Sequence, residues 1–222
     1  MNKLGRFILV LGILCSSFAT YAQPVFKGGG QALENFLKEH IIYPEFSSKN
    51  CISASIKVSF RVDKTGKVTN VKTNNGLGID LDDEAIRVVK MTSGKWTLPA
   101  GIAAANYLLP IRFTPDYSHC STATPMSIEQ AITQYKARQE LENAVTNYYE
   151  NKYAGKADTT KQSYIDALKQ QLGFDDELID DVLKQASAKL KQGDTDGACT
   201  DWKFIRNIGS DKADGFIARY CK

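Results

Sequence analysis

The feature that most constrains the fold is an unbroken alternation of apolar and polar side chains from Ile52 to Asp63. Side chains of a strand point alternately to opposite faces of a sheet, so this segment predicts a strand with one buried and one solvated face. The apolar positions are Ile52, Ala54, Ile56, Val58, Phe60 and Val62. A small sheet built on such a strand leaves an unpaired backbone edge, and that edge can be a functional surface.

Two more strands are predicted after it. Residues 63–66 are typical of a hairpin turn, and 67–73 return as a second, weakly alternating strand. A third strand is predicted at Tyr107–Phe113, where alternation resumes. Pro110 lies inside this strand, and proline is tolerated almost only at an edge or a bulge because it cannot donate a ladder hydrogen bond. We therefore expect the third strand to lie at the edge of the sheet.

Two helices are predicted around these strands. Helical spacing of apolar residues marks 31–40, which follows the glycine run 28–30 and ends before Tyr43-Pro44. We interpret the glycine run as a flexible turn, because it lacks the lysine and preceding strand of a nucleotide loop. The second helix runs to Met91 and begins with an acidic cluster, which suits the positive end of a helix dipole. The same cluster lacks the spacing of a calcium loop, so capping is the favoured interpretation and no metal site is predicted. The cluster consists of Asp80, Asp82, Asp83 and Glu84.

Everything after the third strand is predicted to be helical. Residues 119–126 are polar and rich in Thr and Ser, so we expect a hinge there between a first domain at 23–118 and a helical region at 127–222. Ser127 and Gln130 form a capping-box pattern that opens a helix reaching about 153. Helical spacing predicts four further helices, the last two of them short and separated by Gly209.

The first 22 residues have the pattern of an export signal. Lys3 and Arg6 precede an apolar run of about thirteen residues, and Ala22 ends a small-residue cleavage motif. The run is shorter than the roughly 20 residues that a spanning helix needs. We therefore expect cleavage after Ala22, a mature chain that begins at Gln23 and a periplasmic location.

The four cysteines of the mature chain permit three pairings, and an even number in an exported protein favours disulfides. Cys199 begins and Cys221 ends a predicted antiparallel helix pair, so these two are expected to pair. Cys51 precedes the first strand and Cys120 follows the third. If those strands are antiparallel neighbours, Cys51 and Cys120 also meet.

Charge and composition exclude some classes of function. The whole chain carries a net charge of +3, and two of those charges lie in the signal segment. A nucleic-acid binder needs a larger basic excess, so that class is set aside. The two histidines, His40 and His119, have no sequence-local partner for nucleophilic catalysis. The sequence therefore predicts neither an enzyme nor a cofactor.

In this order and spacing, several short motifs in residues 25–115 resemble the C-terminal domain of TonB-family proteins, particularly the forms common in Bacteroidetes. The motifs are Phe26-Lys-Gly-Gly-Gly30, Tyr43-Pro44, Val58-Ser-Phe-Arg-Val-Asp-Lys-Thr-Gly66, Gly78-Ile-Asp-Leu-Asp-Asp-Glu-Ala-Ile86, Lys95-Trp96, Pro99-Ala-Gly101 and Leu109-Pro-Ile-Arg-Phe113. The resemblance implies an α+β domain whose three-stranded antiparallel sheet has the first strand in the centre.

The resemblance also implies a function. TonB C-terminal domains bind an extended segment of an outer-membrane receptor by adding it as a strand beside their third strand, a mode known as β-augmentation. The matching positions are Tyr107, Leu108, Leu109, Pro110, Ile111, Arg112 and Phe113. An outer-membrane receptor or another envelope protein is thus the expected partner, and a bare edge also permits two copies to pair as a homodimer.

Two features of the chain differ from a TonB protein that transmits force. We find neither an inner-membrane anchor nor a long proline-rich spacer, so we expect receptor binding without energy transduction. The last 35 residues or so resemble a single TPR/Sel1-like helical pair, and one such unit needs packing neighbours because repeat arrays require about three units. The alternative function is an envelope scaffold, in which the helical region recruits a protein partner.

Overall fold

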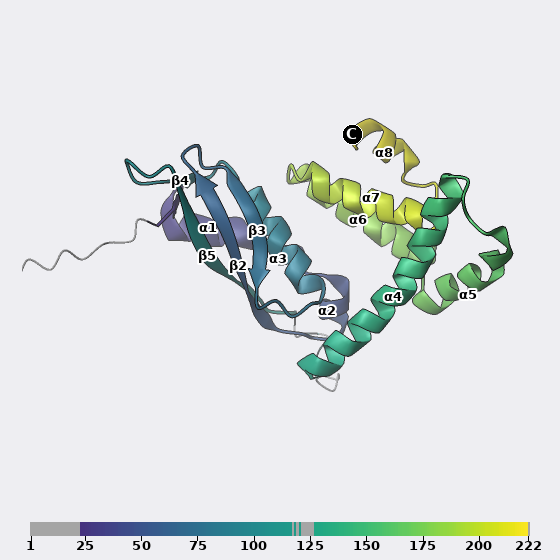
Figure 1. Cartoon of the computed structure of the whole chain (residues 1–222). Coiled ribbons are helices and arrows are strands. Elements are labelled where there is room, and N and C mark those ends of the chain that lie inside the picture. The colour runs from purple at the N-terminus through teal and green to yellow at the C-terminus, as the bar shows by residue number, and fades with distance from the viewer. Residues whose placement is uncertain (1–22, 117, 119, 121–126, 222) are drawn as a thin grey trace, which may run out of the picture.

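The computed structural model describes residues 23–116, 118, 120 and 127–221. The predicted signal peptide, His119 and all of the predicted hinge except Cys120 lie outside the described residues. The fold is α+β, as predicted: a three-stranded antiparallel sheet with helices is followed by a region made of helices (Figure 1).

The sheet has the strand order β3-β2-β5. The alternating segment forms the central strand β2 (Ala54–Asp63), and the hairpin turn leads into β3 (Val68–Asn74). On its other side β2 pairs with β5 (Ala104–Phe113) in one unbroken register of ten residue pairs. Pro110 therefore lies in an edge strand with no bulge toward β2, which confirms the edge predicted from that proline.

The β2–β3 pairing is less regular than the β2–β5 pairing. Its register shifts between Ser59 and Arg61, and in β3 Asn70 adopts a positive φ of 52°. Two residues of β3 thus lie opposite Phe60, the arrangement of a β-bulge, which locally increases the twist of the strand pair.

One face of the sheet forms the first hydrophobic core. Apolar side chains of β2 and β5 pack there against α1 (Gly29–His40), α2 (Glu45–Lys49) and α3 (Asp80–Met91). The largest fully buried side chain of this core, Trp96, donates its indole N–H to Thr92 at 2.8 Å. The opposite face of the sheet is exposed, as the alternation predicts. We call the elements β1–β5 with α1–α3 the sheet half.

A second, two-residue ladder was not predicted. β1 (Val25–Phe26) pairs with β4 (Trp96–Thr97), and the β2–β3 turn packs against it through Gly66. Gly66 has φ +83°, and a Cβ there would lie 2.4 Å from the Trp96 carbonyl oxygen. Only glycine fits this contact without a shift of the backbone.

The helical half consists of α4–α8. Its longest element, α4 (Ile128–Tyr153), begins with the predicted capping box of Ser127 and Gln130. The early turns of α4 pack on the core of the sheet half, where Ala131 is fully buried, and its later turns pack in a second core around Val145. A single helix therefore carries the chain from one core to the other (Figure 1).

The remaining helices surround Trp202, the largest fully buried side chain of the second core. They are α5 (Gln162–Leu172), which a 3-10 turn at Thr159–Lys161 precedes, α6 (Asp176–Lys191), α7 (Thr195–Asn207) and α8 (Asp214–Tyr220). The helical content agrees with the predicted helical region, and the TPR/Sel1 resemblance stays a prediction.

Both predicted disulfides are present. Cys51 and Cys120 are joined with a Cα–Cα distance of 5.8 Å, and Cys199 and Cys221 with one of 5.6 Å. The reasons given from the sequence hold: β2 and β5 are antiparallel neighbours, and the second bridge joins the second turn of α7 to the end of α8.

The acidic cluster lies at the start of α3, as predicted, but it does not cap the helix. The N-cap of α3 is Ile79, and no side chain caps the helix there. Asp82 instead accepts the amide hydrogens of Leu77 and Gly78 in the preceding loop, and Asp80 accepts the amide of Ser47. Within the described part of the chain no group of acidic, histidine or cysteine side chains is arranged to hold a metal ion.

Candidate partner-binding edge and the contact between the two halves

The predicted binding segment lies along β5, the outer strand of the sheet. Its side chains alternate between the core and the solvent. Leu109, Ile111 and Phe113 are buried, whereas Leu108, Pro110 and Arg112 are exposed. Leu108 keeps 45% of its surface exposed, which is high for a leucine in a strand. The outer edge of β5 is thus bordered by a leucine, a proline and an arginine.

Aromatic contacts hold the beginning and the end of β5 in place. Tyr107 lies 5.7 Å from the ring of Phe60 and 5.4 Å from Trp96, while Phe113 meets Tyr43 edge-to-face at 6.0 Å. Such pairs add stability beyond the area they bury. The strand is therefore a rigid element, whose backbone is already extended before any partner arrives.

No strand that the structure describes pairs with the outer edge of β5. Among the described residues, the backbone hydrogen bonds of 104–113 are those of the ladder with β2. One further bond comes from a side chain, the hydroxyl of Ser53, which donates to the Phe113 carbonyl at 3.1 Å. A row of unpaired amide and carbonyl groups of this kind is a template for strand addition.

The opposite edge of the sheet, β3, is a poorer template. The bulge at Asn70 interrupts its spacing, and the amide of Val68 at its start already donates to the Ser93 hydroxyl at 3.1 Å. Bulges at edges hinder further pairing. The regular edge of the sheet is therefore β5.

A second feature, which the sequence analysis did not predict, lies between the two halves. Arg87 of α3 donates to both oxygens of Glu84, at 2.6 and 2.7 Å, and to Asp194 at 2.8 Å. It also donates to the carbonyl of His40 at 2.5 Å. Its side chain is only 11% exposed, and those of Glu84 and Asp194 are 6% and 9% exposed. We call this group the Arg87 network.

The network joins three elements. Glu84 also accepts the amide of Ile42 after α1, at 2.7 Å, and Asp194 caps α7 by accepting the amide of Gly197 at 2.9 Å. Beside it, Gln192 donates to the carbonyl of Glu39 at 3.3 Å. The residues of α1, α3 and the start of α7 are thereby fixed to one another. The sequence offers one hint, the three-residue spacing of Glu84 and Arg87 on a helix, but Asp194 is 107 residues away.

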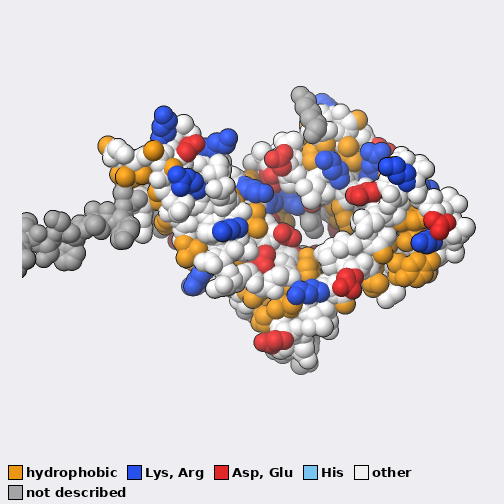
Figure 2. Space-filling model, in the orientation of Figure 1, with side chains coloured by type: hydrophobic (Ala, Val, Ile, Leu, Met, Phe, Trp, Pro, Cys, Tyr) orange, Lys and Arg blue, Asp and Glu red, His pale blue; other side chains and the backbone are white. Residues whose placement is uncertain are grey.

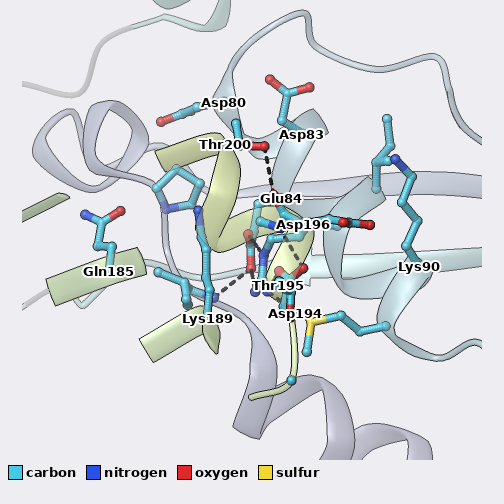
Figure 3. A pocket seen from close by; sticks show the side chains of 17 residues that line it. Asp80, Asp83, Glu84, Lys90, Gln185, Lys189, Asp194, Thr195, Asp196 and Thr200 are labelled. Carbon is cyan, nitrogen blue, oxygen red and sulfur yellow. Dashed lines mark hydrogen bonds and ion pairs between the residues drawn. The ribbon is translucent and has the colours of Figure 1, made fainter. Parts of the chain in front are cut away.

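The network forms one wall of a cavity of about 760 Å³ between α3 and the helices α6 and α7 (Figure 3). Five acidic and three basic residues contribute to its lining, and burial raises the pKa of both Asp80 and Asp83 above their ordinary value. The donors of Arg87 point at carboxylates of the protein itself rather than into the open space. The ion pair of Arg87 with Asp194 in this wall therefore links the two halves.

A second cavity of about 870 Å³ lies between α2 and the helices α4, α5 and α6. Its walls are mixed, with Phe46, Leu141 and Phe174 beside Arg138 and Glu142. Arg138 pairs with Glu142 at 2.7 Å and donates to the carbonyl of Leu172 at 3.0 Å. Neither of these two cavities is lined by β5.

A comparison with protein families supports the resemblance predicted for the sheet half. Residues 39–115 match the family described as Gram-negative bacterial TonB protein C-terminal. This segment is therefore similar to a TonB C-terminal domain. The match covers about a third of the chain and ends two residues after β5, so it includes the whole three-stranded sheet and excludes β1, most of α1 and the helical half. Searches of curated proteins and of solved structures gave no significant match.

The TonB C-terminal domain is a non-enzymatic protein-interaction domain of the bacterial envelope. Two disulfides fit an exported protein, because such bonds persist in oxidising compartments. No helix in the described residues is both long and apolar enough to cross a membrane.

Proposed function

We propose that this protein is a periplasmic binding module that takes up an extended segment of an outer-membrane receptor as a fourth strand beside β5. The observation that carries the proposal is the sheet order β3-β2-β5, which leaves the ten-residue strand β5 outermost. The backbone of β5 supplies affinity, and its exposed side chains supply selectivity. The family match supports the class of partner.

The geometry of β5 suits this role. The strand is held straight by a continuous ladder and by aromatic contacts at Tyr107 and Phe113, so little ordering entropy is lost when a partner pairs with it. An added strand would place alternate side chains beside Leu108 and Arg112 on the exposed face. Binding requires no force, and energy transduction forms no part of the proposal.

Amide hydrogen exchange tests the proposal directly. The mature chain is mixed with synthetic peptides that represent the amino-terminal segments of outer-membrane receptors from the same genome, and exchange is followed by mass spectrometry. We expect exchange in 104–113 to slow when a peptide binds, because amides that face solvent become paired. Exchange in β3 (Val68–Asn74) is the internal control and should not change.

Photo-crosslinking locates the partner independently. A photoreactive residue at Leu108 or Arg112 should capture the peptide, while the same residue at the exposed Asn74 on β3 should not. Capture and protection confined to 127–222 would contradict the proposal and support the alternative of an envelope scaffold whose helical half recruits a partner. Peptide-free crosslinking between two copies through β5 would indicate the homodimer instead.

A further inference from the structure

The open face of the sheet carries a concentration of positive charge that strand addition at β5 does not require. Lys57 and Arg61 of β2, Lys72 of β3 and Arg112 of β5 are all exposed on this face. We call these four side chains the cationic face. Figure 2 shows Lys and Arg side chains spread over the part of the molecule that the sheet occupies in Figure 1.

The charges of this face have no acidic partner in the part of the chain that the structure describes. Within the described residues none of the four has an ion pair, in contrast to Arg87 between the halves and Lys189 within the helical half. The three strands contain one acidic residue, Asp63, at the end of β2. Its carboxylate is occupied by the turn, since it accepts from the amides of Thr65 and Lys67 at 2.8 and 3.0 Å.

The spacing of the cations follows the strand repeat. Lys57 and Arg61 are four residues apart on the same face of β2, a separation of about 13 Å. Lys72 lies opposite Ser59, midway between them, and Arg112 lies opposite Ser55. Measured along the direction of β2, successive cations are therefore about 7 Å apart, which is the distance between alternate side chains of an extended chain. The hydroxyl of Ser59, between Lys57 and Arg61, donates to the carbonyl of Lys72 at 3.3 Å.

We propose that this face binds an extended, acidic protein segment in which Asp or Glu occupies alternate positions, laid along β2. Complementary charge favours a carboxylate-bearing partner, and the regular spacing favours a polypeptide strand. The inference goes beyond the proposed function, because three of the four cations lie on β2 and β3 rather than on β5. An anionic membrane surface needs no such spacing, and this face offers Leu108 as its one large exposed apolar side chain.

A labelled ten-residue peptide in which Glu alternates with Ser is the probe, and the same peptide with Gln in place of Glu is its control. Fluorescence anisotropy should show binding of the Glu peptide alone, weakening as salt is raised because exposed charges are screened. The variant with Lys57→Glu, Lys72→Glu and Arg112→Glu should bind roughly tenfold more weakly or not at all. Lys203→Glu, at an exposed lysine of α7, is the matched control and should leave binding unchanged.

Carbodiimide crosslinking, which joins a carboxylate to a contacting amine, then locates the peptide. We expect the crosslinks to map to Lys57 and Lys72. Crosslinks that map to other lysines, or equal binding by the triple variant, would overturn the proposal. So would binding of phosphatidylglycerol vesicles in the absence of peptide binding. Circular dichroism confirms that the triple variant is folded. Binding of the receptor peptides to the wild type tests strand addition at β5 separately, so a failure of the cationic face to bind the Glu peptide can be distinguished from a failure of strand addition.

Discussion

Removing the positive charge of Arg87 should destabilise the protein more than any other single substitution in the contact between the two halves. Arg87→Met keeps most of the aliphatic stem but leaves Glu84 and Asp194 as buried carboxylates without their cation. It also leaves the carbonyl of His40 without that donor. Breaking a buried pair by removing one partner costs about 3–5 kcal/mol, because the remaining charge stays desolvated.

The assay is urea unfolding of the mature, oxidised chain, followed by tryptophan fluorescence. Trp96 reports on the sheet half and Trp202 on the helical half, since each lies in one of the two cores. The exposed pair of Lys38 and Glu34, at 3.0 Å with side chains 71% and 58% exposed, supplies the control. Lys38→Met should cost at most about 0.5 kcal/mol.

A rescue experiment separates the lost charge from lost packing. Arg87→Met combined with Glu84→Gln and Asp194→Asn removes all three charges of the network. This triple variant should regain a large part of the stability lost by Arg87→Met, since no carboxylate is then buried alone. A loss below about 1 kcal/mol for Arg87→Met, or a triple variant less stable than the single one, would refute the reasoning.

Three more outcomes are expected. Gly66→Ala should destabilise the chain by clearly more than Gly101→Ala: both have positive φ, +83° and +84°, but only at Gly66 would a Cβ meet a backbone oxygen, that of Trp96 at 2.4 Å. Thermal unfolding measures the two losses of stability. Gly101→Ala should show the roughly 1–2 kcal/mol of backbone strain alone, and Gly66→Ala should show this strain together with the clash. Burial raises the pKa of Asp201, one of whose carboxylate oxygens has no hydrogen-bond partner. The folded state then binds this proton more readily than the unfolded chain, so Asp201 makes stability rise as pH falls through its folded pKa. The stability of Asp201→Asn relative to the wild type should therefore be highest near pH 7. Urea unfolding should show this difference shifting in favour of the wild type as the pH is lowered to about 4. A stability difference that does not change with pH would contradict the prediction. Replacing both cysteines of the α7–α8 disulfide by serine should cost about 3 kcal/mol, measured by chemical unfolding, because the bridge closes a loop with a sequence separation of 22.

Much of this fold follows from local patterns of the sequence. The alternation at 52–63 and at 107–113 gave β2 and β5, because a strand with one buried face requires a period of two. Pro110 predicted the edge position of β5, because a residue of a central strand must donate its backbone N–H to the ladder and proline has none. The cysteine pairings followed from the same reasoning, because antiparallel neighbours bring the start of one element to the end of the other.

The tertiary structure alone decided what joins the two halves and what lies on the open face. Glu84 belongs to an acidic cluster that suits a helix start, yet its carboxylate binds Arg87 and the amide of Ile42. No local pattern brings Asp194 to Arg87, because that contact depends on where α7 packs. Likewise, four cations scattered over three strands become one surface only through the register of the ladder, which the pairing of β2 with β3 and β5 sets. Local periodicity determines which face of an element is buried, whereas contacts between distant elements depend on how the cores assemble.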